Sequence, residues 1–161
     1  MRLLPAAFVA AALVASSASA AEFIAGVGVA ADGDSFRIGE QIVRLYAIDA
    51  PELAQVCPTP GGRTWRCGEE ARQRLKELLA LGPVACAGEE FDQFGRLIAE
   101  CDDYNGNSIN ATLVLEGLAW AFTRYDDLFE PEEKAARAEG VGIWQVPTLP
   151  AWEWRVENPR R

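Results

Sequence analysis

Short apolar runs alternate with turn-forming residues over the first part of the sequence, and this pattern predicts strands. Residues 22–29 are small or apolar, and the runs 35–38 and 41–48 are separated by a Gly-Glu turn. Runs of about four to eight residues between turn signals are typical of strands. We therefore expect an antiparallel meander of three strands, followed by a loop rich in Pro and Gly over residues 53–66.

Three later stretches carry the signals of helices. Apolar residues recur at intervals of three and four over residues 69–81, and a Gly-Pro pair follows directly. Residues 108–116 begin with Ser108, a residue type that commonly caps a helix. Residues 131–139 are charged and amphipathic and begin with a proline, which is favoured in a first turn.

Two further strands complete the predicted fold. They span residues 84–87 and 97–104, and the Trp-bearing tail from Pro150 is expected to be loose at its end. Five short strands with an interposed helix are typical of a small closed barrel of the OB type. The sequence therefore predicts an α+β fold, a five-stranded OB barrel with about three helices.

The first twenty residues have the pattern of a secretory signal peptide. Arg2 is followed by an apolar run over residues 3–15, and small residues occupy positions 18–20. The apolar run is too short to cross a membrane. We expect residues 1–20 to be removed, which leaves a single domain with a C-terminal tail over residues 21–161, exported to the periplasm or secreted and no longer attached to a membrane.

Four cysteines are present in a chain that is expected to be exported, which favours two disulfides over nucleophiles or metal ligands. A zinc site would need closely spaced cysteine pairs, which are absent. Three pairings are possible. We favour Cys57 with Cys67, which closes the Pro- and Gly-rich loop, and Cys86 with Cys101, which joins two neighbouring strands.

The charged composition limits the possible chemistry. The 161 residues include no histidine, which excludes Ser-His-Asp and Cys-His catalysis and histidine-liganded zinc. The net charge of −9 becomes −10 without Arg2. Proteins that bind nucleic acid are usually basic, so this balance counts against such a partner.

A cluster of charged residues brackets the third predicted strand. Asp34 follows a turn, Arg44 lies inside an apolar run, and Asp49 and Glu52 stand at the end of that run. Each has an ordinary explanation: a turn or loop acid, a solvated carboxylate, or a structural ion pair. Together they indicate a site for a hard, oxygen-liganded cation beside an arginine that needs an anion. Asp32 is interpreted as a turn residue.

The motifs around these residues resemble those of the staphylococcal nuclease (thermonuclease) family. They follow the family's order from Asp32 to Trp144: D-G-D-S-F-R-I, V-R-L-Y-A-I-D-A-P-E, D-Q-F-G-R-L-I-A, L-V-L-E-G-L-A-W-A and G-I-W. The cysteine-bearing loop and the W-x-W-R tail resemble exported bacterial members. The resemblance implies the OB barrel, and a nuclease that depends on Ca²⁺.

The resemblance also implies roles for individual residues. Asp34 and Asp49 match the calcium-binding aspartates, and Ala50 stands where the family uses a backbone carbonyl as a metal ligand. Glu52 matches the carboxylate that activates or orients the attacking water. The two arginines that hold the scissile phosphate correspond to Arg44 and Arg96.

The activity implied is cleavage of DNA or RNA with little sequence preference, leaving 5′-hydroxyl and 3′-phosphate ends. Phe94 departs from the family, since a well-known member has a tyrosine there that contacts a phosphate. Tyr125 matches a tyrosine that lies against the bound base, and stacking favours a single-stranded substrate; a buried core tyrosine is the alternative.

The chain is expected to be a monomer. Two other interpretations of its function remain. One is a non-catalytic module of the same fold that binds nucleic acid or peptide, and the other is a disulfide-stabilised structural barrel. Modules that have lost activity lack the aspartates, the glutamate or the arginines, whereas this sequence keeps all five residues. The sequence therefore favours the nuclease.

Overall fold

The computed structural model describes residues 21–159, so the predicted signal peptide lies outside the described residues. Within residues 21–159, no helix has the length and apolar character needed to cross a membrane. The strands are β1 (Glu22–Gly26), β2 (Gly28–Ala30), β3 (Ser35–Ile38), β4 (Gln41–Leu45), β5 (Ile48–Asp49), β6 (Cys57–Pro58), β7 (Thr64–Trp65), β8 (Val84–Phe91), β9 (Leu97–Asp102) and β10 (Trp120–Ala121). The helices are α1 (Cys67–Ala80), α2 (Ile109–Leu115), α3 (Glu130–Glu139), the 3-10 turn η1 (Gly142–Trp144) and α4 (Ala151–Glu157).

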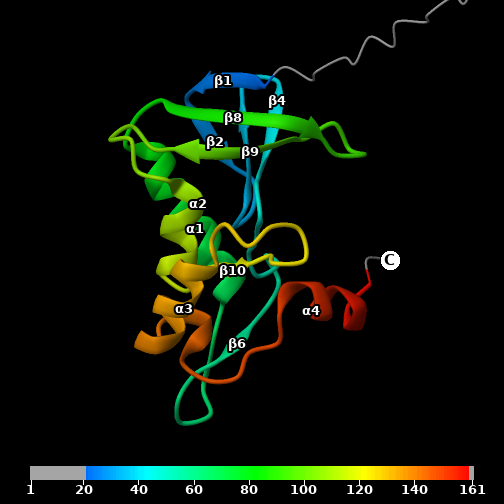
Figure 1. The fold of residues 1–161 in the computed structure, drawn as a ribbon. Helices are drawn as coiled ribbons and strands as arrows, with labels where there is room; N and C mark the ends of the chain where they lie inside the picture. The colour runs from blue at the N-terminus through cyan, green and yellow to red at the C-terminus, as the bar shows by residue number, and fades with distance from the viewer. Residues whose placement is uncertain (1–20, 160–161) are drawn as a thin grey trace, which may run out of the picture.

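The main sheet has six strands in the order β1-β8-β9-β4-β3-β2. Its two edge strands, β1 and β2, follow each other directly in the chain, so the bent segment they form curls the sheet back on itself (Figure 1). The glycines on either side of the bend allow other side chains to approach closely: a Cβ on Gly26 would lie 2.7 Å from Ile38, and one on Gly28 would lie 2.7 Å from Leu79. The predicted α+β class is confirmed. The segment predicted as the first strand forms two strands, β1 and β2, so the main sheet has six strands and not five.

The meander prediction holds for β2, β3 and β4, which pair antiparallel in sequence order. The strand β4 then pairs parallel with β9, which is antiparallel to β8. This parallel pairing joins segments far apart in the sequence and brings the end of β4 beside the start of β9. The predicted loop over residues 53–66 also contains a small hairpin, β6–β7.

The core lies between the curled sheet and the helices α1 and α2 (Figure 1). The spacing that predicts α1 places Ala71, Leu75, Leu78 and Leu79 on one face, and all four are buried. Burial of each leucine side chain contributes about 1.5–3 kcal/mol. The helix therefore exists because its apolar face covers the sheet.

The other two predicted helices are also confirmed. The hydroxyl of Ser108 accepts a hydrogen bond of 3.1 Å from the backbone N–H of Ala111, as expected of the residue before α2. The helix α3 begins at Glu130 with Pro131 in its first turn. It ends at Gly140, whose φ of 63° lies in the left-handed region that glycine adopts at low cost.

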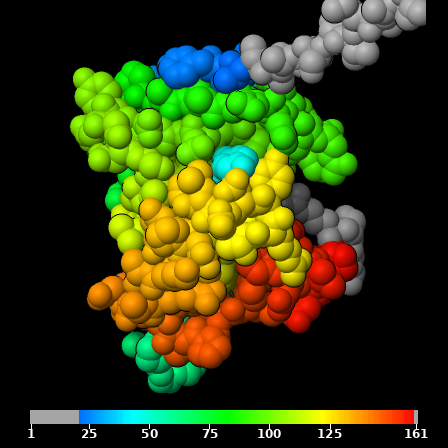
Figure 2. Space-filling model, viewed as in Figure 1, coloured from blue at the N-terminus to red at the C-terminus, as the bar shows by residue number. Residues whose placement is uncertain are grey.

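The tail forms a fourth helix, α4, which the sequence pattern does not predict. Ala151 is fully buried, and the Trp152 ring lies 6.0 Å from the Trp120 ring and 5.6 Å from the Phe122 ring. In Figure 2 the tail (red) borders the segment 118–128 (yellow), which spreads over the face towards the sheet (green). A helix of this length is marginal in water, so tertiary packing stabilises it.

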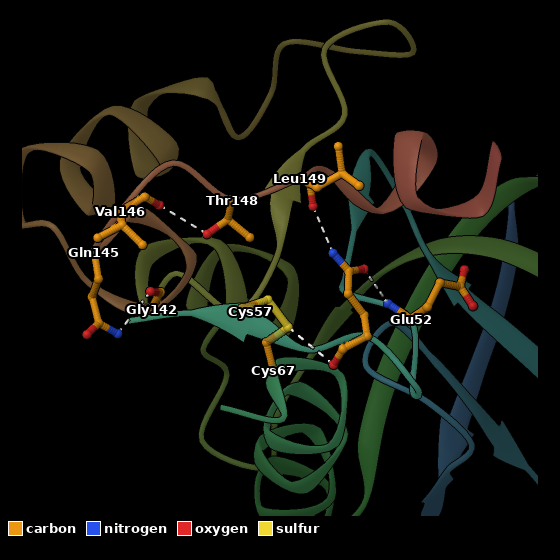
Figure 3. The surroundings of a disulfide bond; sticks show 9 residues. Glu52, Cys57, Cys67, Gly142, Gln145, Val146, Thr148 and Leu149 are labelled. Carbon is orange, nitrogen blue, oxygen red and sulfur yellow. Dashed lines mark hydrogen bonds between the residues drawn. A yellow bond between two sulfur atoms is a disulfide. The ribbon is translucent and has the colours of Figure 1, made fainter. Parts of the chain in front are cut away.

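Both favoured disulfides are present. Cys57 and Cys67 join the β6–β7 hairpin to the start of α1, and Cys86 and Cys101 face each other across β8 and β9. Cys67 Sγ lies 3.4 Å from the backbone carbonyl oxygen of Gln55, in the loop that also carries Glu52 (Figure 3). This disulfide therefore supports the loop that follows β5.

Candidate active site

Asp34 is positioned by the turn that precedes β3. Its backbone N–H donates to the carboxylate of Asp32 at 3.1 Å, which confirms Asp32 as a turn residue. The Asp34 side chain is buried, and its Oδ2 accepts a hydrogen bond of 2.8 Å from the backbone N–H of Ala50. This bond joins the turn before β3 to Ala50, the residue that follows β5.

Arg44 connects the two buried aspartates. Its Nη1 donates to Asp34 Oδ1 at 2.6 Å, and its Nη2 donates to Asp49 Oδ1 at 2.9 Å. Both aspartates are nearly inaccessible to solvent, with exposures of 3% and 1%. A buried charge is costly unless it is paired, so this arginine stabilises the pair of carboxylates.

Burial and the charge of Arg44 act in opposite directions on the pKa of the Asp34 carboxyl group. Burial raises the pKa of Asp34 to about 7, and repulsion from Asp32 and Asp49 adds to this effect, while Arg44 opposes it. The pKa of Arg44 is lowered by burial but raised more by the two aspartates, so it lies above its ordinary value. A cation beside Asp34 would offset the remaining cost of its negative charge.

Glu52 lies on the loop after β5 and contacts an arginine that the sequence did not single out. Arg155 of α4 donates through Nη1 to Glu52 Oε1 at 2.9 Å and to Asp49 Oδ1 at 3.1 Å. Its Nη2 donates to Asp49 Oδ2 at 2.8 Å. The W-x-W-R pattern in the tail was the available signal, but nothing in it indicates a partner that lies 103 residues away.

Arg96 is held at the tip of the β8–β9 hairpin. Its Nε donates to Asp92 Oδ2 at 2.6 Å, and its guanidinium carbon lies 5.5 Å from the centre of the Phe94 ring. The carboxylate of Asp92 also accepts backbone hydrogen bonds from Phe94 and Arg96. This turn fixes the direction in which Arg96 leaves the sheet.

One cleft brings the predicted residues together. It has a volume of about 520 Å³ and is lined by Asp32, Gly33, Asp34, Ile42, Arg44, Ala50, Pro51, Glu52, Phe94, Arg96 and Arg155. Asp49 reaches it through its bonds to Arg44 and Arg155. Segments from both ends of the chain therefore form a hollow that contains carboxylates and guanidinium groups.

The donors at this cleft suit a hard cation. Among residues 21–159, no group of three or more His, Cys, Asp or Glu side chains is placed to hold a metal ion. The predicted calcium ligands differ from such a group, because they are two side-chain carboxylates, of Asp34 and Asp49, and one backbone carbonyl, of Ala50. These are all oxygen donors, which Ca²⁺ prefers.

Tyr125 lies in a second hollow, which we call the tyrosine pocket. This pocket of about 370 Å³ is lined by Ala21, Tyr46, Ala87, Gly88, Glu89, Glu90, Ile98, Glu100, Tyr125, Asp126 and Leu128. Tyr125 is 46% exposed, so it is not a buried core residue. Its hydroxyl donates to Glu90 at 2.7 Å, and its ring meets Tyr46 edge to face at 5.3 Å.

The cleft and the tyrosine pocket are neighbours on the sheet. Arg44 lines the cleft and pairs in register with Ile98, which lines the pocket. Tyr46 follows directly after β4, and its backbone N–H donates to the carbonyl of Ala99 in β9 at 2.8 Å. A polymer bound across this face could therefore occupy both.

The chain is similar in sequence to several known proteins. The family described as staphylococcal nuclease homologue matches residues 42–146. The chain is 33% identical over 157 residues to the succinoglycan biosynthesis protein ExoI of Rhizobium meliloti (strain 1021), covering 96% of this chain and 82% of that protein. It is 35% identical over 126 residues to the micrococcal nuclease of Shigella flexneri, covering 70% and 67%. It is 33% identical over 128 residues to the SPbeta prophage-derived endonuclease YokF of Bacillus subtilis (strain 168), covering 71% of this chain and 42% of that protein.

Proposed function

Because this chain belongs to the staphylococcal nuclease family, we propose that it is an exported, Ca²⁺-dependent nuclease with little sequence preference. The observation that carries the proposal is the single cleft containing Asp34, Arg44, Ala50, Glu52 and Arg96. Two of the similar proteins are named as nucleases, and a third is named for succinoglycan biosynthesis. Because these names differ, the proposal rests on the chemistry of the residues that line the cleft.

The arginines suit a phosphodiester group. A guanidinium has five N–H donors, and Arg44 uses three of its donor bonds on Asp34, Asp49 and the carbonyl of Ile48. Arg96 is held through Nε by Asp92, which orients its guanidinium at the rim of the cleft. Both groups would donate to phosphate oxygens as negative charge develops on them in the transition state.

Glu52 supplies the proton acceptor. Its carboxylate would accept a hydrogen bond from the attacking water and orient it towards the phosphorus, with general-base transfer worth about 10²–10⁴ in rate. Calcium bound by Asp34, Asp49 and the Ala50 carbonyl would supply Lewis-acid stabilisation of the phosphate. The products would carry 5′-hydroxyl and 3′-phosphate ends, as the family resemblance implies.

The substrate is proposed to be DNA or RNA, with single strands favoured through stacking on Tyr125. The ring of Tyr125 is exposed beside the cleft, as stacking requires. The net charge of −9 opposes an anionic polymer, so we expect affinity to be sensitive to salt. The two disulfides and the signal-like first twenty residues support export to the periplasm or the medium as a monomer.

A cleavage assay tests this function directly. Purified, oxidised protein is incubated with a short single-stranded DNA, with calcium or with a chelator, and the products are separated by length. We expect cleavage that stops on chelation, and a loss of about 10²–10⁴ in kcat for Glu52→Gln. The new ends should accept a 5′ label from a polynucleotide kinase without phosphatase treatment.

The matched control is Glu116→Gln, which removes a carboxylate from an ion pair with Arg74 of α1, outside the lining of the cleft. This variant should cleave like the wild type. Undiminished cleavage by Glu52→Gln or Arg96→Ala would refute the assignment of the site. Binding of DNA without any cleavage would favour the non-catalytic module.

A further inference from the structure

Arg155 reaches the cleft from a part of the chain that lies beyond residue 146, where the family match ends. Its guanidinium makes three hydrogen bonds, of 2.8 to 3.1 Å, to the carboxylates of Asp49 and Glu52. Burial lowers the pKa of Arg155, but these bonds raise it more, so the group is charged. A positive charge therefore bridges a predicted metal ligand and the predicted water-orienting carboxylate.

The helix α4 is fixed in place by the packing of its first turn. Ala151 is fully buried, and Trp152 packs against Trp120 and Phe122. Residues four apart lie on the same helix face, so Ala151 and Arg155 both point towards the body of the protein. The guanidinium is therefore presented by an anchored helix and not by a loose tail.

A second connection joins the tail to the loop that carries Glu52. The side chain of Gln55 is 1% exposed. Its Nε2 donates to the carbonyl of Leu149 at 2.8 Å, and its Oε1 accepts from the backbone N–H of Glu52 at 3.1 Å. Figure 3 shows Leu149 and Glu52 on the two sides of this bridge. Both the backbone and the side chain of Glu52 are thus tied to the C-terminal segment.

We propose that Arg155 is a positioning residue for phosphodiester hydrolysis: it holds the Glu52 carboxylate beside Asp49 in the orientation needed to accept the proton of the attacking water. This inference rests on the function proposed above. A glutamate side chain has several rotatable bonds, and holding it in one orientation removes an entropic cost from the reaction. The guanidinium also offsets the repulsion between the carboxylates of Asp49 and Glu52. Arg155 acts through Glu52 and is given no contact with the substrate.

The test is a double-mutant cycle of four proteins: wild type, Arg155→Met, Glu52→Gln and the combination. Methionine removes the charge but retains an unbranched side chain. For single-stranded DNA at saturating calcium, we expect kcat to fall about 10–100-fold in Arg155→Met, with KM within about twofold. In the Glu52→Gln background the same change should have no further effect on kcat.

Two further measurements separate positioning from general damage. Calcium affinity, measured by calorimetry without substrate, should stay within about threefold of the wild type in Arg155→Met, because Asp49 is still held by Arg44 at 2.9 Å and the proposed role of Arg155 is towards Glu52. Added guanidinium ions should restore part of the kcat lost in Arg155→Ala. Arg124→Met is the matched control, because the Arg124 guanidinium lies 5.7 Å from the centre of the ring of Trp152, a residue of α4, and Arg124 is outside the cleft lining.

Each other outcome has a definite meaning. Tighter calcium binding with unchanged or higher kcat in Arg155→Met would show that Arg155 competes with the cation, and this overturns the proposal. An equal loss of kcat in the Glu52→Gln background would show that Arg155 acts independently of Glu52. An unchanged kcat, with an active wild type, refutes the positioning role alone, whereas an inactive wild type refutes the proposed function on which it rests.

Discussion

The cleft and the tyrosine pocket lie side by side, but they balance their carboxylates in different ways. In the cleft, Asp34 and Asp49 accept hydrogen bonds from guanidinium groups. In the tyrosine pocket, Glu90 and Asp126 accept hydrogen bonds from the neutral phenols of Tyr125 and Tyr46. The described residues that line this pocket include no lysine or arginine.

The difference indicates which part of a nucleotide each hollow suits. Guanidinium groups offer charged donors to phosphate oxygens, so the cleft can receive an anion despite its own carboxylates. The tyrosine pocket keeps its negative charge and repels phosphate, but its exposed aromatic ring can stack on a neutral base. An acidic protein can therefore bind a polyanion if the positive charge is concentrated where the phosphate lies.

Arg44 is the residue that contacts both buried aspartates of the cleft, so we expect its substitution to have the largest effect. We expect Arg44→Met to lower the free energy of unfolding by about 3–5 kcal/mol, because the buried Asp34 loses its arginine partner and the buried Asp49 keeps only Arg155. Urea denaturation measures this loss. Arg74→Met, which breaks a half-exposed pair with Glu116, should cost only about 0–1 kcal/mol. Equal losses in the two variants would show that the arginine in the cleft has no special structural role.

Calcium binding is the second property expected to distinguish the cleft from the tyrosine pocket. At about 100 times the dissociation constant, the ion should stabilise the folded protein by about 2.7 kcal/mol, seen as a rise in melting temperature. Asp49→Asn should abolish this rise, whereas Asp126→Asn in the tyrosine pocket should retain it. If Asp126→Asn alone abolished the rise, the cation site would lie in the other hollow.

Substitutions of Tyr125 test whether the tyrosine pocket binds a base. Tyr125→Ala should weaken binding of a single-stranded oligonucleotide by about 1–3 kcal/mol, the usual value of one stacked base. Tyr125→Phe keeps the ring and loses only the hydrogen bond to Glu90, so its affinity should stay close to that of the wild type. Fluorescence anisotropy with Glu52→Gln as the shared background avoids cleavage. Similar losses in both variants would indicate that the hydroxyl, and not stacking, matters.

The smallest expected effect is a pH dependence in the tyrosine pocket. The hydrogen bond from Tyr46 to Asp126, together with burial, raises the pKa of Tyr46 to about 12. In the unfolded chain this phenol loses its proton near pH 10, so the folded state retains a proton that the unfolded state has lost. The contribution of Tyr46 to stability is complete below about pH 10 and is lost as the pH rises towards about 12.

Urea denaturation across this alkaline range checks the prediction. The free energy of unfolding of the wild type should decline more steeply than that of Tyr46→Phe, which has no proton to lose. Tyr104→Phe, at an exposed position outside both hollows, should decline like the wild type. Parallel curves for wild type and Tyr46→Phe would contradict the assigned pKa.

Most elements of the fold could be predicted from local pattern. The strand 35–38 has the predicted bounds, and the helices α1, α2 and α3 begin within two residues of the expected positions. The division of the first strand was missed, because it depends on how closely Gly26 and Gly28 approach side chains from elsewhere in the fold. The helix α4 was missed for the same kind of reason, since its stability comes from packing against Trp120 and Phe122.

By itself, the sequence determined the chemistry available to this protein. It contains no histidine, it places carboxylates at the ends of two strands and Arg44 inside one of them, and its four cysteines leave three possible pairings. These properties depend only on residue type and on short spacings along the chain. Local structure alone therefore decides where such residues lie within a strand or turn.

Only the tertiary structure decided how distant residues combine. The register of β8 against β9 places Cys86 opposite Cys101, and the parallel pairing of β4 with β9 brings the cleft beside the tyrosine pocket. The packing of α4 carries Arg155 to a glutamate 103 residues away in the chain. Such contacts are set by the packing of the whole core, because no short-range pattern specifies which distant partner a charged side chain will meet.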